Sequence, residues 1–357
     1  MPAAPCYATG TRITTTRGAV PVEDLAVGDR AVTAAGEARS IRWIGHRLID
    51  CRTYGRREEV MPVRVARDAF GSGRPNRDLV LSPAHSVCID VLGEMLIPIF
   101  VLVNGATIRQ EVVEHVTYWH VELDSHDILM AEGLPAESYL DMGNRGFFAD
   151  GAAGPSAIDS WAGLATEPAT YAHANFCRPY REVGPLIAAL RDRLRDRALA
   201  LGWRLKPDLW TNTHLVVDGV RVDPIVAGLS ARFAMPASAR NVWLVSDTTV
   251  PSHVETSLDE RVLGVCVEGL HVDDGIEPVR SVDLVDSILC VGFHYAEAGP
   301  RRWTAGRARL PRTLWSGCTR KWSLRLDLAD SALPRWCPPR DVGEDFACSM
   351  PVERRTA

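Results

Sequence analysis

The sequence lacks the long apolar segments that membrane and secreted proteins carry. Its longest apolar run, residues 95–103, is shorter than the ~20 residues that a bilayer-spanning helix needs, and it contains a proline. The first ten residues have neither the basic nor the apolar segment of a secretory signal. We therefore expect no membrane partner and, by default, a cytoplasmic location. Export by a route that needs no such signal remains an alternative.

Paired cysteines and concentrated positive charge are also missing. The nine cysteines are odd in number and include no Cys-x-x-Cys pair, which argues against a disulfide framework and against a structural zinc site. The formal net charge is -5 and neither half of the chain is basic, whereas binding nucleic-acid phosphates needs a concentrated positive face. We expect reduced thiols, no metal, no cofactor and no nucleic-acid partner.

The composition and length are those of a globular protein with two domains. The chain has 357 residues, of which 46% are hydrophobic and 24% charged. Residues 6–141 consist of short alternating or apolar runs separated by turn signals such as Ala35-Gly36 and Asn104-Gly105. This pattern predicts an all-β domain, and it makes the protein mainly β.

A second domain is predicted after a segment rich in glycine, alanine, serine and proline. Residues 142–175 have this composition and are expected to be a linker. A leucine-rich amphipathic stripe between Pro185 and Gly202 predicts one helix. Strand-like runs follow, so that residues 176–332 are expected to form a β-sandwich with one helix and residues 333–357 an irregular tail.

Three sequence blocks in the first domain occur in an informative order. They are residues 6–15 (CYATGTRITT), residues 81–87 (LSPAHSV) and residues 116–139. Together they resemble the hedgehog/intein (Hint) family, and residues 42–45 and 102–105 are similar to a bacterial subgroup of it. The resemblance covers residues 6–141 and implies the all-β Hint fold.

The resemblance also implies a reaction of the chain on its own backbone. Cys6 would attack the carbonyl of Pro5 and convert the peptide bond into a thioester, an N-to-S acyl shift. His85, in a block similar to the family's Thr-x-x-His, would be the acid that polarises the amide, and Ser82 would offer its hydroxyl to the same group. Water, a thiol, an amine or an alcohol would then cleave the thioester.

Assistance from the third block is left open between three residues. Asp124, His126 and Asp127 are candidates for aiding the acyl shift. Residues 117–120 repeat the Thr-x-x-His spacing, but His120 lies between residues typical of a strand, and we expect it to pack or to face solvent.

Splicing is not expected, because the matching end of the block is Glu137-Ser138, whereas inteins end in His-Asn, whose asparagine cyclises. What remains is a single-turnover, hedgehog-like cleavage rather than turnover catalysis. Five residues precede Cys6, so the reaction would release a pentapeptide, unless the sequence continues upstream or the fold is kept without turnover.

Two other functions compete with self-processing. One is an interaction or carbohydrate-binding protein that keeps the Hint scaffold, and the other, less favoured, is a cysteine hydrolase that acts on foreign substrates.

Parts of the second domain resemble an accessory β-domain of bacterial Hint proteins, where a sugar or peptide could bind. Six residues of this domain could form such a binding surface. We expect them to stabilise the fold instead, since buried charges form pairs and tryptophans fill small β cores. They are Asp259, Arg261, His294, Glu297, Arg302 and Trp303.

Overall fold

The computed structural model describes residues 5–141, 145, 175–297, 299 and 301–339. It divides the chain into two compact units, Met1–Leu201 and Gly202–Ala357. Most of the predicted linker, and the end of the predicted tail, lie outside the described residues.

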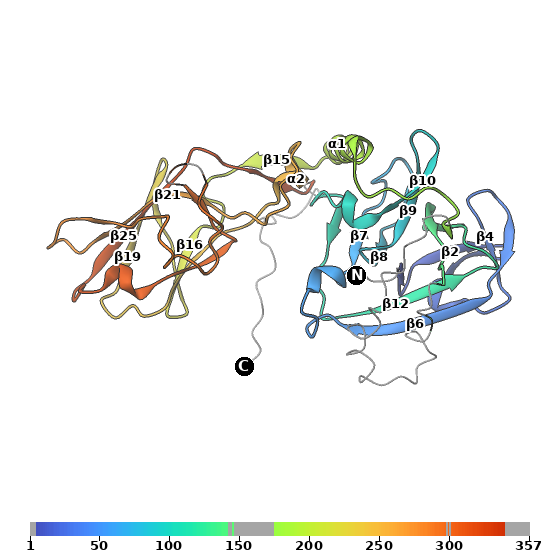
Figure 1. Cartoon of the computed structure of the whole chain (residues 1–357), viewed down its shortest axis with the longest axis horizontal. Helices are drawn as coiled ribbons and strands as arrows, with labels where there is room; N and C mark the ends of the chain where they lie inside the picture. The colour runs from blue at the N-terminus through green and yellow to red at the C-terminus, as the bar shows by residue number, and fades with distance from the viewer. Residues whose placement is uncertain (1–4, 142–144, 146–174, 298, 300, 340–357) are drawn as a thin grey trace. The chain divides into compact units, whose positions relative to one another are not determined.

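The first unit contains two antiparallel sheets. The six-stranded sheet has the order β11 (Ile108–Gln110), β7 (Val63–Val65), β8 (Leu79–Leu81), β1 (Tyr7–Ala8), β12 (His115–Glu122), β6 (Trp43–Asp50). The other sheet has the order β10 (Glu94–Pro98), β9 (Ser86–Asp90), β14 (Leu134–Glu137), β13 (Ile128–Ala131), β2 (Arg12–Thr15), β4 (Arg30–Val32), β5 (Ala38–Ser40), with β3 (Gly18–Pro21) beside β2. Strands β12 and β6 run side by side over their full length (Figure 1).

One apolar core holds the two sheets of this unit together. Tyr7 of β1, Leu81 of β8, Val87 of β9 and Ala136 of β14 all contribute fully buried side chains to it. Because β1 lies between β8 and β12 in the first sheet, residues from three distant parts of the chain meet where β1 begins.

The predicted helix exists as α1 (Pro185–Ala200), but it belongs to the first unit rather than to the second domain. Ile187, Leu190 and Leu194 join the core of the first unit. Arg191 Nε donates to the carbonyl of Val101 at 2.6 Å, in the 3-10 helix Ile99–Leu102. An amphipathic pattern shows which face of a helix is apolar but not which core receives that face, and the predicted boundary before this helix was therefore wrong.

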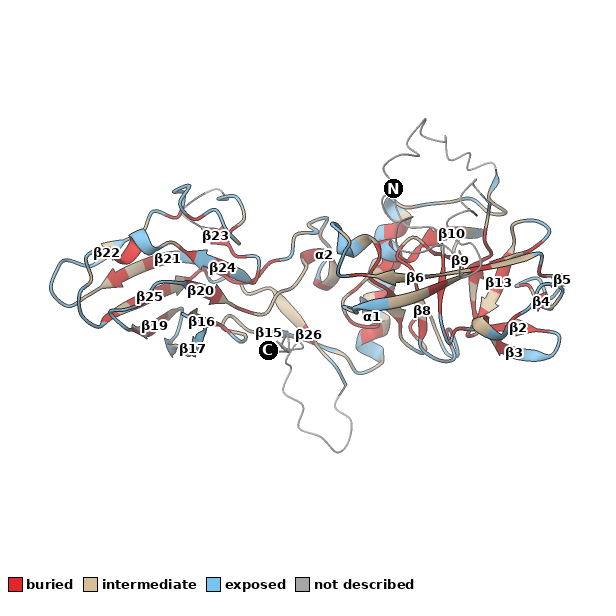
Figure 2. Cartoon of the chain, turned by 90° about the horizontal axis from the view of Figure 1, so that it is seen from below, coloured by how far each residue is buried: buried red, intermediate tan, exposed pale blue. Residues whose placement is uncertain are grey.

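The two larger antiparallel sheets of the second unit share one core, as the β-sandwich prediction requires. One sheet is β17 (Val220–Val222), β16 (His214–Val217), β20 (Val242–Val245), β24 (Arg307–Leu310). The other is β18 (Ile225–Ala227), β19 (Ser230–Met235), β25 (Trp322–Leu328), β21 (Cys266–Asp273), β22 (Arg280–Ser281), with β23 (Arg302–Trp303) also paired to β21. Buried and half-buried residues alternate along β25 (Figure 2).

The predicted irregular tail begins with a strand. Strand β26 (Pro334–Cys337) pairs antiparallel with β15 (Arg204–Pro207), and the short helix α2 (Pro251–Val254) lies against it. Pro334 occupies the first position of this strand, where a proline is compatible with a short edge strand. This part of the tail prediction was therefore wrong.

Candidate functional site

The strand order of the first sheet assembles a buried polar site at Cys6. Strand β1 begins directly after Cys6 and pairs with β8 on one side and with β12 on the other. Ser82 follows β8, and His120 lies in β12. The exposed fractions of Cys6, Ser82 and His120 are 3%, 0% and 1%, so the site is closed to bulk solvent.

Ser82 makes two hydrogen bonds with the backbone of Cys6. The Cys6 N–H donates to Ser82 Oγ at 2.9 Å, and the Ser82 N–H donates to the Cys6 carbonyl at 3.0 Å. The first of these bonds engages the amide nitrogen of the Pro5–Cys6 peptide bond, which is the bond that the sequence predicts to be cleaved. Ser82 is therefore placed where the sequence analysis expects it.

His120 is the histidine in contact with the thiol. Its Nε2 lies 3.2 Å from Cys6 Sγ. Burial lowers the pKa of this ring, and a hydrogen bond with the backbone of Pro5 raises it by a smaller amount. Tyr139 packs edge-on against the His120 ring at 5.0 Å, and Trp43 stacks at 6.3 Å. The sequence predicts that His120 packs or faces solvent, although residues 117–120 have the Thr-x-x-His spacing. Only the pairing of β1 with β12 shows that the ring reaches the sulfur.

His85 lies beside Tyr7, the residue that follows Cys6. The Ser82–His85 turn is closed by the His85 N–H, which donates to the Ser82 carbonyl at 3.1 Å. The ring of His85 packs 4.3 Å from the ring of Tyr7, the residue that follows Cys6, and only 1% of its surface is exposed. His85 therefore lies beside Tyr7 and the backbone of Cys6, whereas His120 contacts the Cys6 sulfur itself.

Burial keeps all three titratable groups of the site uncharged at neutral pH. It raises the pKa of the Cys6 thiol well above the usual value, with a smaller opposite effect of the Ser82 hydrogen bond. Burial also lowers the pKa of His85 to about 4 and that of His120 to about 3. A neutral imidazole beside a neutral thiol can accept the thiol proton, because its nitrogen keeps a free electron pair.

The three candidates from the closing block lie elsewhere. Asp124 and Asp127 both pair with Arg39 of β5, Asp127 at 2.7 Å, and neither makes a hydrogen bond or ion pair with Cys6 in the described part of the chain. His126 Nε2 lies 3.4 Å from Glu137 Oε2 instead. The structure therefore brings Cys6, Ser82 and His85 together with the unexpected His120, and it leaves Asp124, His126 and Asp127 away from the thiol.

A comparison with protein families identifies this part of the chain. The family model described as Hint domain matches residues 5–143. These residues form a Hint domain. No curated protein matches the chain.

Solved intein structures are similar to the Hint domain at low sequence identity. The intein-like domain from Clostridium thermocellum is 12% identical, with 38% of this chain and 98% of that chain covered and a TM-score of 0.29. The gp41-1 intein is 12% identical over 38% and 98% of the two chains, with a TM-score of 0.26. The DnaB intein from Synechocystis sp. PCC 6803 is 11% identical over 38% and 100%, with a TM-score of 0.23.

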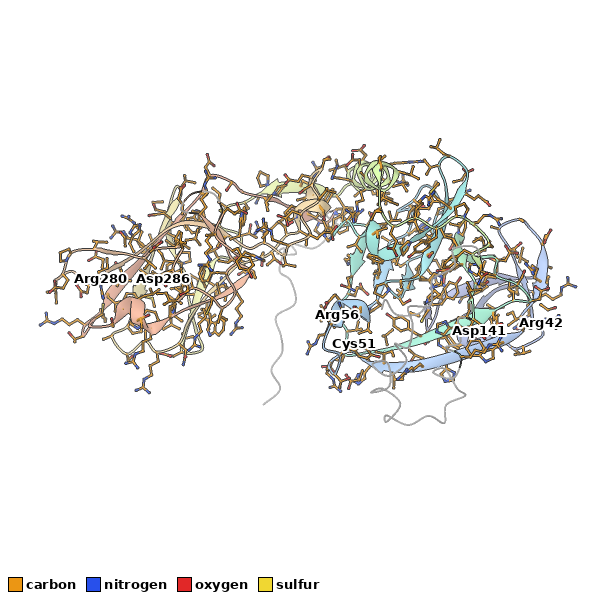
Figure 3. All side chains as sticks on the ribbon, in the orientation of Figure 1. Arg42, Cys51, Arg56, Asp141, Arg280 and Asp286 are labelled. Atoms are coloured by element: carbon orange, nitrogen blue, oxygen red, sulfur yellow. The ribbon has the colours of Figure 1, made fainter. Side chains whose placement is uncertain are left out.

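The other thiols of the Hint domain lie apart from Cys6 in separate apolar clusters. Cys51, labelled in Figure 3, is fully buried against Val60 and Met61, and Cys88 packs near Cys177. None of the described cysteines forms a disulfide, and the described residues contain no group of metal-binding side chains that could hold an ion. None of the helices in the described ranges has the length and apolarity that crossing a bilayer requires.

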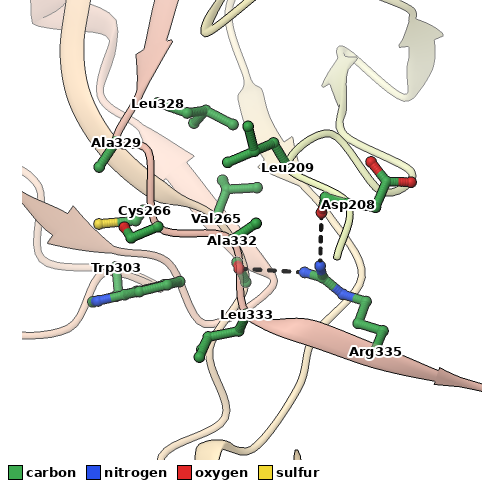
Figure 4. A pocket seen from close by; sticks show the side chains of 12 residues that line it. Asp208, Leu209, Val265, Cys266, Trp303, Leu328, Ala329, Ala332, Leu333 and Arg335 are labelled. Atoms are coloured by element: carbon green, nitrogen blue, oxygen red, sulfur yellow. Dashed lines mark hydrogen bonds between the residues drawn. The ribbon is translucent and has the colours of Figure 1, made fainter. Parts of the chain in front are cut away.

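The candidate ligand-binding residues of the second unit make structural contacts. Trp303 packs with Cys266 and Leu333 beside a small pocket, where Arg335 donates to the Asp208 carbonyl (Figure 4). Arg302 is 8% exposed, and its guanidinium group donates two hydrogen bonds to backbone carbonyls. One reaches the carbonyl of His294 at 2.7 Å and the other that of Leu284 at 2.9 Å.

The remaining charged candidates pair with one another. Arg261 forms ion pairs with Asp259 at 2.7 Å and with Glu297 at 3.0 Å, and His294 Nε2 lies 2.9 Å from the carbonyl of Val262. These side chains are partly exposed rather than buried, 40% for Arg261 and 27% for Asp259, so the expected buried charge pair is not found and the structural role of this cluster stays a prediction.

Proposed function

We propose that the Hint domain carries out hedgehog-like self-processing at the Pro5–Cys6 bond. The family match supports self-processing in general. The observation that favours this particular reaction is the pair of contacts around Cys6: a histidine nitrogen 3.2 Å from the sulfur, and a serine oxygen 2.9 Å from the amide nitrogen of the bond to be broken.

The reaction begins at the sulfur. His120 takes the thiol proton, and the sulfur attacks the carbonyl carbon of Pro5, so that an S–C bond forms and the carbonyl becomes an oxyanion. The C–N bond then breaks. The Cys6 nitrogen leaves as an amine because it gains a proton from the protonated fraction of His85. His120 then passes the thiol proton to His85, so that both imidazoles return to their starting states and no proton is gained or lost. Residues up to Pro5 are now joined to Cys6 through a thioester.

A second nucleophile completes the cleavage. Water, a thiol, an amine or an alcohol attacks the thioester carbonyl, the C–S bond breaks, and the Cys6 sulfur recovers a proton. A Glu137-Ser138 sequence cannot cyclise as asparagine does, so the chain after Cys6 stays whole. The near-complete burial of Cys6, His85 and His120 disfavours a cysteine hydrolase that must admit a large external substrate, whereas the Pro5–Cys6 bond already lies at the site and needs only a small nucleophile to enter.

Intact-mass measurement tests this function. After incubation with hydroxylamine or dithiothreitol, we expect the wild-type chain to lose everything before Cys6, and we expect Cys6→Ala to keep its mass. Cys51→Ala removes another buried thiol of the same domain and should react like the wild type. An unchanged mass in wild type and Cys6→Ala alike would contradict the proposal and would favour the interaction protein that keeps the Hint scaffold.

A further inference from the structure

Glu137 is a buried carboxylate that the proposed reaction does not use directly. It ends strand β14, and 2% of its surface is exposed. Its Oε1 accepts the Ser86 N–H at 2.7 Å, and its Oε2 lies 3.4 Å from His126 Nε2. Burial of a carboxylate is strongly unfavourable unless its oxygens are engaged, so both contacts are required to keep the charge in the core.

The same residue reaches the self-processing site by two further routes. Its backbone carbonyl accepts the Tyr7 hydroxyl at 2.7 Å, and the Tyr7 ring packs 4.3 Å from the His85 ring. Ser86, which donates to the Glu137 carboxylate, directly follows His85 in the chain. Glu137 therefore holds the residue after His85 and also the aromatic ring against which His85 packs.

We propose that Glu137 is a positioning residue for His85, which it fixes through Ser86 and Tyr7 and whose protonated form it stabilises by its negative charge. This inference rests on the proposed self-processing function. It assigns a role to the Glu137-Ser138 pair, which stands where inteins carry the residues of the C-terminal cleavage. Ser138 is fully buried, and its Oγ accepts the Asp127 N–H at 3.0 Å, so it has a structural role.

The groups that face His85 decide how strongly Glu137 acts on it. They are Cys6 and Tyr7 at the start of β1, His120 on β12, His126 before β13 and Glu137 on β14. Burial lowers the pKa of His85, and among the opposing effects the charge of Glu137 is the largest, whereas His126 lowers this pKa further. Burial keeps Tyr7 neutral, because it raises the pKa of that phenol. Removal of the Glu137 charge should therefore lower the pKa of His85.

The test compares Glu137→Gln with a matched variant in the full chain. Glu137→Gln keeps an oxygen for the Ser86 N–H and removes the charge. Glu132→Gln does the same at another buried glutamate of this domain, whose Oε1 accepts the Arg12 N–H at 2.8 Å. Two quantities are measured: the pKa of His85 by NMR titration of its ring, assigned with His85→Gln, and the pH dependence of hydroxylamine-induced release of the residues before Cys6.

We expect Glu137→Gln to lower the pKa of His85 and to move the release profile to lower pH, with about a tenfold slower release at pH 7 for each unit lost. Glu132→Gln should change neither quantity. A His85 pKa that is the same in Glu137→Gln and in wild type would overturn the inference, whatever the rate of release. The His85 pKa could be lower in Glu137→Gln than in wild type while the wild-type chain releases nothing. That result would support the electrostatic role of Glu137 and overturn the self-processing function alone.

Discussion

At Cys6 the chemistry depends on which side chains the fold places within reach of one sulfur atom. A buried thiol with a raised pKa is a poor nucleophile unless a base takes its proton during attack. His120 satisfies the distance requirement at 3.2 Å, and burial leaves its imidazole neutral and able to accept. The closing-block carboxylates lack this geometry because Arg39 engages them.

Replacement of His120 should therefore slow thioester formation. We expect His120→Gln to reduce the rate of hydroxylamine-induced cleavage by about 10²–10⁴-fold, the usual contribution of a general base. His115→Ala is the matched control, because His115 begins the same strand but is 44% exposed at its side chain. Equal rates in His120→Gln and wild type would show that another group activates the thiol. Melting temperatures of the variants separate a slower reaction from a loss of folding.

At the scale of elements, strand pairing accounts for the Hint site and helix packing for the boundary of its unit. Strand β12 places Tyr118 and His120 on one face, where both are buried, and Trp119 and Val121 on the other, where Val121 is buried in the main core and Trp119 stacks on His46. A one-residue shift of β12 would turn His120 away from Cys6. The eight paired positions with β6 make such a shift unfavourable, because every hydrogen bond of the ladder would have to be exchanged.

Helix α1 should stabilise the unit that contains the Hint domain. Leu190→Ala removes a side chain that is 4% exposed and packs in the core of the first unit, which should cost about 2–5 kcal/mol of unfolding free energy. Hydrogen exchange measured by mass spectrometry should then become faster in β1, β8 and β12. Leu199→Ala is the control at a 44%-exposed position of the same helix and should have little effect. Faster exchange confined to β19–β25 would contradict the placement of the helix.

At the scale of the whole molecule, the chain consists of two units with separate apolar cores. The core of the first unit draws on both of its sheets and on α1, and the core of the second draws on two sheets of the sandwich. Each of these cores contains residues of one unit only. This arrangement is the physical basis for independent folding.

Residues 1–201 and 202–357, produced as separate chains, should each unfold in one cooperative transition. Circular dichroism during heating measures this directly. A third chain that ends at residue 175 keeps the Hint domain but lacks α1, and it should melt at a lower temperature than residues 1–201, because Ile187, Leu190 and Leu194 no longer cover the core. A chain of residues 202–357 without a cooperative transition would contradict the assignment of two units.

Local patterns in the sequence were sufficient for the class of fold, the all-β Hint region and the presence of one helix, and they singled out Cys6, Ser82 and His85 as candidates. These features depend on spacing within short segments, such as the two residues between Ser82 and His85, and such spacing can be read from the sequence without knowledge of the fold. The family resemblance then supplied the expected reaction, and the family match over residues 5–143 agrees with the predicted range of 6–141.

Tertiary structure alone decided which histidine touches the thiol and which core receives the helix. His120 is 114 positions from Cys6, and their contact exists because β1 pairs with β12 in one register. The partners of Glu137 are likewise spread over β1, β9 and the segment before β13. Contacts between residues far apart in the chain depend on the register of strands and on the burial of whole faces, which are properties of the assembled sheets rather than of any local pattern.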